Sequence, residues 1–522
     1  MAEAAGDGGA RRRLETQPAG GDAPQGQHAN YLAIDLGASS GTALLGRFDG
    51  DRFTFREIHR FDNEPVRVLG HLHWDTLRLW HEIGGALTRY ARDVHEPLSG
   101  LAVDSWGVDF GLLDRSGTLL GNPYHYRDAR VDGMPRRVAE AVPPQSLYAT
   151  TGIQTMPINT LYQLYGMVQR RDPQLELAQT LLLTPDLFHY WLSGATVTEY
   201  TIASTTQMLD VHTRRWADEL LSALGIPTDI LLPPVMPGAV VGHLRPDVAA
   251  DAGLRGEVPV VAVGGHDTAS AVAAIPDLDE RSAYISSGTW SLVGMEIERP
   301  LVNEASRALN VTNEGGVGGT IRLLRNVPGL WLLQESRRQW QREGRAYAWE
   351  EILRLAAASQ PFRSLCDPDV PAFQRPGDLP SSLRSYCAGT LQPQPESVGE
   401  VARCCLESLA LRYRWVLRAL EELTGRRVET VYVVGGGSRN DLLNQFTADA
   451  CGCRVVAGPV EASAIGNVMM QAVADGELED VAAGRRAIAA SLSRRTYEPN
   501  PDVSVWDEAF GRFSVLLERA TP

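Results

Sequence analysis

The chain repeats one local pattern four times: an apolar, β-prone run ends abruptly in a turn rich in Gly, Ser and Asp. Such runs predict strands, and such turn residues predict tight connections. The pattern occurs at residues 31–48, 100–114, 261–272 and 283–296. In the first and the last of these segments a second β-prone run follows at once, so both are expected to be hairpins.

Two of the turns carry the same letters. The tetrapeptide "SSGT" stands at residues 39–42 and again at 286–289, each time inside an expected strand–turn–strand. Four letters can repeat by chance, yet the two copies fall at the start of what look like two halves of the chain. The repeat therefore indicates a duplicated unit, in which each half presents one hydroxyl-rich turn.

Strands alternate with helical stretches in the second half of the chain. Residues 428–452 predict a strand, a glycine turn and a helix, residues 453–476 repeat that order, and residues 401–423 are expected to be helical. Mixed strands and helices indicate an α/β fold. The 522 residues suffice for two sizeable domains, with a hinge expected at "IPDLDE", residues 275–280.

One residue type is missing altogether, because all 49 basic residues are arginines. Without lysine the chain cannot carry a P-loop lysine, the strand lysine of a protein kinase or a lysine Schiff base. If the chain handles a nucleotide, the phosphates must be held by backbone amides, hydroxyls, arginine or a metal ion.

Charge and composition argue against several classes of protein. A formal net charge of −15 argues against a nucleic-acid partner, and no apolar stretch approaches the roughly 18 residues that a membrane span needs. Six cysteines are too few for a disulfide scaffold and favour reduced thiols in the cytoplasm, although a Cys366–Cys387 pair across a Pro-rich loop stays open. Residues 1–29 lack an apolar segment and are expected to form a disordered tail.

The first hairpin, "DLGASSGT", combines a carboxylate with an anion-binding turn. Asp35 ends an apolar strand, where it could hold a hydrated metal ion, and the turn after it offers N–H groups and hydroxyls to an anion. A plain turn stabilised by Ser and Asp side chains is the alternative. The same letters match G-x-S-x-G, the nucleophile elbow of hydrolases, but that motif needs a helix after the turn, and here a strand is expected.

Two further glycine-containing stretches suggest binding. "GGGSRN", residues 435–440, follows an expected strand and opens a helix, which suits close approach of a ligand to a helix N-terminus. It has no reactive side chain, and a tight turn is the alternative. In "DSWGVDF", residues 104–110, Trp106 could stack on a sugar while a carboxylate such as Asp109 takes its hydroxyls. A core aromatic beside surface acids is the alternative.

The stretch "GGHDTAS" places Asp267 where a helix should begin. Asp is a good helix N-cap, and a helix N-terminus favours the ionised carboxylate. An ionised Asp is also the kind of base that activates a hydroxyl for attack on a phosphoryl group. Capping and catalysis are therefore compatible interpretations of Asp267.

In combination, these stretches resemble the FGGY family of carbohydrate kinases. The resemblance runs from about residue 30 to about residue 500, and each motif is weak alone while the ordered set is specific. It is carried by "DLGASSG", "GGHDTAS", "SSGTWS", "VVGGGSRN", "REIHRFDN", "DSWGVDFGLLD", "YRDAR", "NTLYQLY", "EYTIASTTQ", "NVTNEGG", "GLWLLQ" and "AGPVEASAIGN".

The family resemblance implies a fold and a reaction. The fold is α/β, with two ribonuclease-H-like (actin/hexokinase-like) domains and a cleft between them. Within the family the segments are most similar to kinases of L-rhamnulose, which implies ATP-dependent phosphorylation at O1 to give L-rhamnulose 1-phosphate and ADP, with Mg²⁺. Another ketose, such as L-fuculose, L-xylulose or D-xylulose, and a non-catalytic actin-like sugar-binding or scaffold protein are the alternatives. The resemblance leaves a monomer or a small homo-oligomer open.

The resemblance also assigns roles to residues and boundaries to domains. Asp267 would be the catalytic base, and Asp35 would hold Mg²⁺. The expected sugar contacts are Gly107, His266, Asp267, Thr268 and Asn326, to which the residue types alone add Trp106 and Asp109. The expected ATP contacts are Ala38, Ser39, Ser40, Gly41, Thr42, Thr289, Gln334 and Gly436. The expected segments are a tail at 1–29, an N-terminal domain at 30–275 that binds sugar and phosphate and carries the base, an ATP-binding C-terminal domain at 276–505, and a C-terminal segment at 506–522.

One position departs from the family pattern. Kinases of this kind often carry arginine directly after "SSG", where this chain has Thr42. Either a charged phosphate contact is missing, or another arginine such as Arg322 or Arg325 takes its place.

Overall fold

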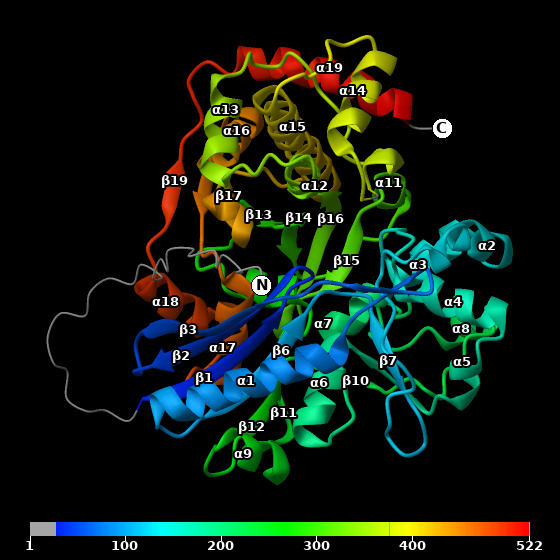
Figure 1. Cartoon of the computed structure of the whole chain (residues 1–522), viewed down its shortest axis with the longest axis vertical. Coiled ribbons are helices and arrows are strands. Elements are labelled where there is room, and N and C mark those ends of the chain that lie inside the picture. Colours follow the sequence, from blue (N-terminus) through cyan, green and yellow to red (C-terminus); the bar gives the residue numbers. More distant parts are fainter. Residues whose placement is uncertain (1–27, 375, 521–522) are drawn as a thin grey trace, which may run out of the picture.

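The computed structural model describes residues 28–374 and 376–520 and confirms an α/β fold of two domains (Figure 1). Each domain is built on one mixed sheet. Most of the tail predicted at residues 1–29 lies outside the described residues. Both predicted hairpins are present, because β1 pairs with β2 and β13 pairs with β14, each in antiparallel register.

The first sheet has six strands in the order β11-β12-β6-β1-β2-β3. Its members are β1 (Ala29–Leu36), β2 (Ser40–Phe48), β3 (Phe53–Asp62), β6 (Gly100–Ser105), β11 (Ala239–His243) and β12 (Pro259–Ala262). The second sheet has seven strands in the order β15-β16-β14-β13-β17-β18-β19. Its members are β13 (Ser282–Ser287), β14 (Trp290–Ile297), β15 (Thr312–Gly315), β16 (Ile321–Pro328), β17 (Thr430–Val434), β18 (Arg454–Ala457) and β19 (Arg495–Tyr497).

The two sheets share one plan. In each, an antiparallel three-strand meander (β1-β2-β3 or β13-β14-β16) continues into two parallel strands (β6 and β12, or β17 and β18) and an antiparallel edge strand. This common order agrees with the duplicated unit that the repeated "SSGT" indicates. The two hydroxyl-rich turns therefore occupy equivalent places in the two sheets.

Three two-stranded sheets and the helices complete the described part of the chain. The small sheets pair β4 (Val66–Val68) with β5 (His71–His73), β7 (Phe110–Leu113) with β8 (Thr180–Leu183), and β9 (Thr198–Glu199) with β10 (Pro234–Val235). The α-helices are α1 (Thr76–Val94), α2 (Met134–Ala141), α3 (Pro144–Thr151), α4 (Thr160–Arg170), α5 (Pro173–Leu177), α6 (Thr184–Ser193), α7 (Tyr200–Ala203), α8 (Asp218–Ala223), α9 (Pro246–Ala252), α10 (Asp267–Ala273), α11 (Glu304–Ala308), α12 (Trp331–Arg342), α13 (Trp349–Ala358), α14 (Leu379–Gly389), α15 (Val398–Thr424), α16 (Asp441–Cys451), α17 (Ala462–Ala474), α18 (Val481–Ser491) and α19 (Ser504–Ala520). The 3₁₀ turns are η1 (Ala129–Val131), η2 (Ser204–Thr206), η3 (Val317–Gly319), η4 (Pro371–Phe373) and η5 (Gly436–Arg439).

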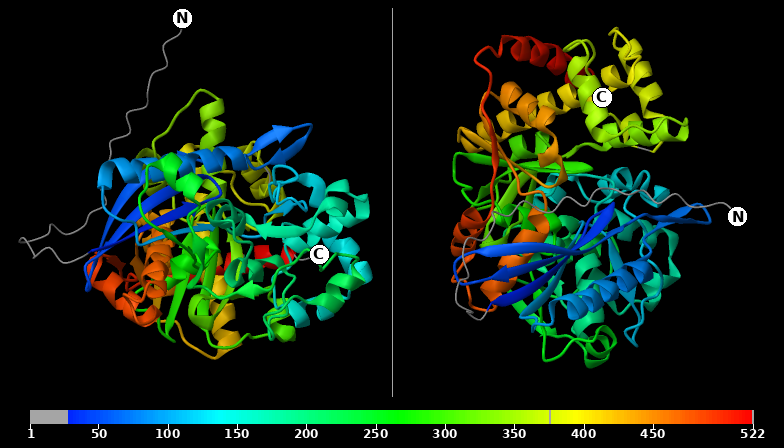
Figure 2. Two further views of the ribbon diagram at one scale, coloured as in Figure 1. Left: turned by 90° about the horizontal axis from the view of Figure 1, so that it is seen from below. Right: turned by 60° about the vertical axis from the view of Figure 1, so that its left-hand side comes forward.

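Helices α10 and α17 lie between the two sheets. Helix α17 packs on β1, β2 and β6 of the first sheet although it comes late in the chain, and α10 contacts both α17 and β13. Side chains of both sheets, such as Tyr31 and Tyr284, join these helices in one buried apolar cluster. The right-hand view of Figure 2 shows α17 (orange) between the two halves. Helices such as α15 and α16 cover the other face of the second sheet.

The six cysteines are free thiols in the structure, and Cys366 and Cys387 are both buried in the second half. The pairing of Cys366 with Cys387 that the sequence left open is not formed in this structure, where both are free thiols. Among the described residues, no helix is long and apolar enough to cross a membrane.

The contact between α10 and α17 depends on the absence of a side chain at Gly466. A Cβ atom built there would overlap the carbonyl oxygen of Ser270 in α10. We expect Gly466→Ala to force the two helices apart and to lower the free energy of unfolding by about 2 kcal/mol, measured by urea denaturation, because a packed core resists extra volume.

The matched control is Gly511→Ala in α19, where a Cβ atom meets nothing within 4 Å. This control is expected to leave stability unchanged or to raise it by about 0.5 kcal/mol, since alanine is the better helix former. Equal stability of the Gly466→Ala variant and the wild-type protein would contradict the packing described here.

Candidate active site

One cavity of about 380 Å³ lies between the two sheets and gathers nearly all of the predicted site residues. Its walls come from both hairpin turns, the loop after β6, the start of α10, strands β15 and β16, and the glycine turn after β17. The predicted residues that line it are Asp35, Ala38, Ser39, Ser40, Thr42, Trp106, Gly107, His266, Asp267, Thr268, Thr289, Asn326 and Gly436. Residues more than 400 positions apart in the chain thus meet at one site.

Three predicted residues do not line this cavity: Gly41, Gln334 and Asp109. Gly41 faces the ring of Phe61, which fills the space that a side chain at position 41 would need. Gln334 stands behind Thr289, whose hydroxyl donates to its Oε1 at 3.2 Å. Both residues therefore lie next to the cavity wall, and their contacts with ATP stay a prediction.

Asp109 is fully buried, and both of its oxygens are occupied by the protein. Oδ2 accepts from the indole N–H groups of Trp74 at 2.6 Å and Trp106 at 3.1 Å, and Oδ1 accepts from Gln163 at 2.9 Å. Burial raises the pKa of Asp109 to about 6 against the effect of these hydrogen bonds. Asp109 thus lies outside the cavity wall, and its carboxylate orients Trp106, whose ring packs on Trp74 with centroids 4.0 Å apart.

The loop "DSWGVDF" holds an unusual backbone conformation. Val108 has a φ of 71°, a region that β-branched residues rarely enter, and such outliers cluster at functional sites. Its N–H donates to Thr205 Oγ1 at 3.1 Å, and its carbonyl accepts from Thr160 Oγ1 at 2.6 Å. Neighbouring Gly107 lets Thr205 approach closely, because a Cβ atom there would lie 3.1 Å from that hydroxyl.

The two hydroxyl-rich turns meet across the cavity. Ser39 Oγ and Thr289 Oγ1 lie 3.5 Å apart, although 250 positions separate them in the chain. The first turn is closed by a hydrogen bond from the N–H of Gly37 to the carbonyl of Ser40 at 2.9 Å. Asn63, from the end of β3, donates its side-chain N–H to the carbonyl of Gly37 at 2.8 Å and holds the turn in place.

Asp267 is the first residue of α10, whereas the preceding His266 occupies the cap position. The predicted capping role of Asp267 is therefore wrong by one residue, and no side chain caps this helix. The carboxylate keeps a 26% exposed side chain and accepts from Thr268 Oγ1 at 3.2 Å. Burial raises the pKa of Asp267, and the charge of His266, the hydrogen bonds from Thr268 and the charge of Arg322 offset only part of that rise. The shift of the Asp267 pKa is thus opposite to the one expected from a helix start, because burial dominates it.

A second carboxylate lies directly behind the predicted metal ligand. Asp35 of β1 and Asp104 of β6 face each other in the register of their parallel pair. Asp104 is fully buried, and Asn467 of α17 donates to its Oδ2 at 2.6 Å. Burial and the charge of nearby carboxylates raise the pKa of both Asp35 and Asp104. This part of the cavity therefore concentrates negative charge.

The donor set here fits a hydrated Mg²⁺ ion. Among the described residues no group of three or more His, Cys, Asp or Glu side chains is arranged to hold a metal by itself. Mg²⁺ does not require such a group, since it is commonly held by one or two carboxylates together with water and substrate phosphates. The half-buried Asp35 and the buried Asp104, whose Oδ1 has no hydrogen-bond partner, supply carboxylate oxygens of that kind.

The arginine beside Thr42 comes from the neighbouring strand. Arg60 of β3 stands directly opposite Thr42 of β2 and lines the cavity. Its Nη2 donates to Glu461 Oε1 at 2.7 Å, so it also joins the first sheet to the start of α17. Neither arginine that the sequence offered as a substitute lines the cavity: Arg322 is fully buried, and Arg325 pairs with Asp369.

Buried glutamates hold the "GGHDT" segment. Glu199, at the start of α7, accepts from the N–H of Gly265 through Oε2 at 3.0 Å, and Thr201 Oγ1 accepts from the N–H of His266 at 3.2 Å. Glu314 of β15 lines the cavity, and its Oε2 lies 3.2 Å from His266 Nδ1. Both glutamates lie in segments that carried the family resemblance, "EYTIASTTQ" and "NVTNEGG". The sequence did not single them out, because their spacing does not show that Glu199 meets Gly265 or that Glu314 meets His266.

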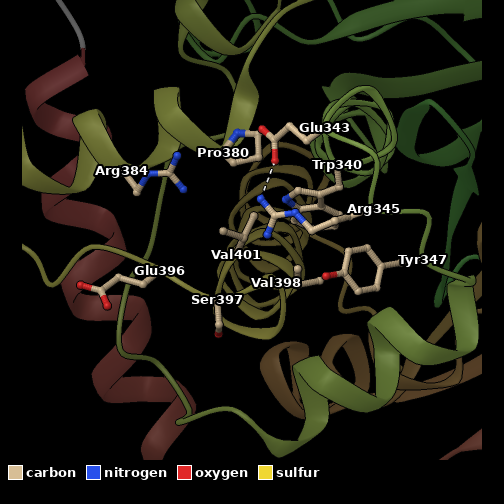
Figure 3. A pocket seen from close by; sticks show the side chains of 10 residues that line it. All are labelled: Trp340, Glu343, Arg345, Tyr347, Pro380, Arg384, Glu396, Ser397, Val398 and Val401. Atoms are coloured by element: carbon tan, nitrogen blue, oxygen red, sulfur yellow. Dashed lines mark hydrogen bonds and ion pairs between the residues drawn. The ribbon is translucent and has the colours of Figure 1, made fainter.

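A second cavity, of about 450 Å³, lies in the C-terminal half between α12, α14 and the start of α15 (Figure 3). Trp340 and Tyr347 form part of its wall, and Arg345 pairs with Glu343 at 2.8 Å. It contains none of the predicted site residues. The chemistry that the sequence predicts therefore belongs to the cavity between the sheets.

Comparison with known proteins agrees with this geometry. Residues 30–274 match the N-terminal domain of the FGGY family of carbohydrate kinases, and residues 283–474 match its C-terminal domain. The chain belongs to the FGGY family of carbohydrate kinases. It is therefore an ATP-dependent carbohydrate kinase.

Relatives and solved structures extend the comparison over most of the chain. A rhamnulokinase of Bacteroides thetaiotaomicron is 47% identical over 484 residues, which cover 93% of this chain and 98% of that protein. A rhamnulokinase of Pectobacterium atrosepticum is 42% identical over 494 residues, covering 94% and 97%. The fold is similar to gluconate kinase from Lactobacillus acidophilus (TM-score 0.78, 15% identity, 95% and 99% covered) and to Plasmodium falciparum glycerol kinase with ADP (TM-score 0.75, 13% identity, 96% and 100% covered).

Proposed function

We propose that this kinase phosphorylates L-rhamnulose at O1 with ATP and releases L-rhamnulose 1-phosphate and ADP. The observation that carries the proposal is the 42–47% identity, over nearly the full length of each chain, to proteins named rhamnulokinase. The cavity supports a sugar kinase of this kind, since it combines a carboxylate base, hydroxyl-rich turns and an aromatic wall. A cytoplasmic location and a monomeric or small homo-oligomeric state are part of the same proposal.

Asp267 is the proposed base. Its carboxylate lies at the start of α10, lines the cavity and is partly exposed. It would orient the O1 hydroxyl and accept its proton while O1 attacks the γ-phosphorus and the bond to the leaving ADP oxygen breaks. Holding both substrates in line between the two sheets would supply much of the rate.

The sugar would lie between the "DSWGVDF" loop and the second sheet. Trp106 offers an apolar ring face held in place by Asp109, and Gly107 leaves room beside it. Asn326 is aligned from the opposite side by Gln154, whose Oε1 accepts from the Asn326 backbone N–H at 2.9 Å. His266 and Thr268 flank the proposed base on both sides.

The phosphates would lie over the two hydroxyl-rich turns. The turn formed by residues 38–42 and the Thr289 turn present N–H groups and hydroxyls toward one another, and the open glycine turn at Gly436 leaves space for the nucleoside. Asp35, with Asp104 behind it, would hold Mg²⁺. When bound, that ion would neutralise charge on the phosphates, which an acidic site otherwise repels.

The proposed substrate is tested by measuring ADP release, through a coupled assay, with L-rhamnulose, L-fuculose, L-xylulose, D-xylulose and glycerol. We expect the highest kcat/KM with L-rhamnulose. A higher kcat/KM with another ketose would replace the proposed sugar and keep the kinase, while an equal response to all five would contradict a site that selects its sugar.

The proposed base is tested by Asp267→Asn. The amide fills the same space but cannot take a proton, so kcat should fall by about 10²- to 10⁴-fold while L-rhamnulose still binds. Turnover is followed by ADP release and binding by calorimetry. Because the pKa of Asp267 is raised, the wild-type kcat should fall on acidification at a higher pH than the pKa of a free aspartate. Near-normal turnover of the variant would rule out this role.

Arg60 lines the cavity opposite Thr42, and we propose that it contacts the phosphates of ATP. This contact is tested by Arg60→Met. Loss of a charge-assisted hydrogen bond should raise KM for ATP by about 10-fold and leave KM for the sugar nearly unchanged. The control is Arg56→Met, since Arg56 is an exposed arginine of the same strand that does not line the cavity. An unchanged KM for ATP in the Arg60→Met variant would assign the phosphate contact to another group.

A further inference from the structure

Two side chains at the start of α7 hold the backbone that leads into Asp267. The N–H of Gly265 donates to Glu199 Oε2 at 3.0 Å, and the N–H of His266 donates to Thr201 Oγ1 at 3.2 Å. Both acceptors are fully buried. The two residues before the proposed base are therefore tied, through their own N–H groups, to a segment that lies far from them in the sequence.

The carboxylate of Glu199 gathers four donors. Oε1 accepts from the N–H of Thr201 at 2.8 Å, and Oε2 accepts from Thr201 Oγ1 at 2.6 Å, from the N–H of Ile202 at 2.9 Å and from the N–H of Gly265. Burial raises the pKa of Glu199 to about 7, and these hydrogen bonds oppose that rise. Above this pKa the carboxylate is ionised and can only accept, which suits four donors.

Gly265 is held from two sides. A Cβ atom at this position would lie 2.7 Å from Glu199 Oε2, so the absence of a side chain is what lets the carboxylate approach. On the other side, the N–H of Ser105 in β6 donates to the carbonyl of Gly265 at 2.9 Å. Glu199 is itself held, since its N–H donates to Asp186 Oδ1 at 3.2 Å. The segment before Asp267 is thus fixed between α7 and the first sheet.

The Asp267 carboxylate has only local support from side chains among the described residues. Thr268 Oγ1, in the next residue, donates to it at 3.2 Å, and Nε2 of His266, in the preceding residue, lies 3.5 Å away. Both neighbours move with Asp267 and cannot fix it relative to the cavity. Packing on α17 holds the body of α10, so the segment before the helix decides how its first residue meets the cavity.

We propose that Glu199, together with Thr201, is a positioning residue that sets where the Asp267 carboxylate stands relative to O1 of the sugar. The inference rests on the proposed role of Asp267 as the base. Glu199 does not line the cavity, so it acts through the backbone of Gly265 and not by touching a substrate. A misplacement on the order of 1 Å can lower a rate by about 10²-fold, and the loss should therefore appear in kcat.

The first test is Glu199→Gln in the full-length kinase. An amide accepts only through its oxygen, so one of the N–H groups that now meet Oε1 and Oε2 would face the NH₂ group. We expect kcat to fall by about 10- to 100-fold with KM for ATP unchanged. Kinetics are measured at about pH 8, where the wild-type carboxylate is ionised. An unchanged kcat, or a raised KM for ATP without loss of kcat, would overturn the proposal.

The second test repeats this change in the Asp267→Asn background, with enough enzyme to follow the residual ADP release. If Glu199 acts through Asp267, its loss should cost less than about threefold in kcat once the base is gone, because residues that act as a unit are not additive. An equal fold loss in both backgrounds would overturn the proposal. Near-normal turnover of Asp267→Asn alone would reject the base itself, which separates the two failures.

A milder pair of variants covers the case in which Glu199→Gln does not fold. Thr201→Val keeps the shape but removes the hydroxyl that joins Glu199 to the N–H of His266, whereas Thr201→Ser keeps that hydroxyl. We expect kcat to fall by about 10-fold in Thr201→Val and to be retained in Thr201→Ser, with KM for ATP unchanged in both. Equal kcat in the two variants would overturn the proposal.

The matched control is Glu407→Gln. Glu407 of α15 is also a buried glutamate that accepts a backbone N–H, since Phe362 donates to its Oε2 at 2.8 Å, and it does not line the cavity either. Its loss is expected to lower stability in urea denaturation and to leave kcat of the folded protein unchanged. A loss of kcat equal to that of Glu199→Gln would show a general effect of losing a buried carboxylate and overturn the proposal.

Discussion

Helices α10 and α17 cross between the two sheets at a point where Gly466 leaves no room for a side chain. Everything at the cavity depends on this crossing. It places Asp267, the first residue of α10, beside the carboxylates of the first sheet and in front of the second sheet. It also lets Asn467, the next residue of α17, reach the buried Asp104 at 2.6 Å. Helix α17, from late in the chain, thus supplies a hydrogen bond to a carboxylate of β6, near the beginning of the chain.

The same crossing explains the electrostatics of the site. The charge of Asp267 raises the pKa of both Asp35 and Asp104, and burial raises the pKa of all three. Such a cluster is costly without a compensating charge. The proposed Mg²⁺ ion and Arg60 would offset it on the phosphate side, and on the sugar side Arg322 lies 3.1 Å from Nδ1 of His266. The apolar surroundings that raise these pKa values would also strengthen each compensating contact.

Local patterns in the sequence were enough for much of this arrangement. Both hairpins, the strand before Asp267 and the glycine turn after β17 follow from runs of β-prone residues and their turn chemistry. The repeated "SSGT" predicted a duplicated unit, and the two main sheets do share one strand order. The identity of the cavity residues came from resemblance to a family and not from spacing, because residues from opposite ends of the chain line one wall.

What the sequence did not reveal depends on register and burial. Arg60 stands opposite Thr42 only because β2 and β3 pair as they do, with an irregularity at Ala43 and Leu44. Asp109 was predicted to contact the sugar, and the sequence did not show that the indoles of Trp74 and Trp106 donate to its Oδ2. The link from Glu314 to His266 requires β15 to lie beside α10, and no local pattern shows that contact.

Transfer of the γ-phosphoryl group to O1 of L-rhamnulose is tested most directly by phosphorus NMR of the reaction mixture with ATP and Mg²⁺. The expected result is one new phosphomonoester signal, split by the protons on C1, that grows in step with ADP. Two results would contradict transfer to O1. One is inorganic phosphate as the only new signal, and the other is a phosphomonoester signal split by protons on a carbon other than C1.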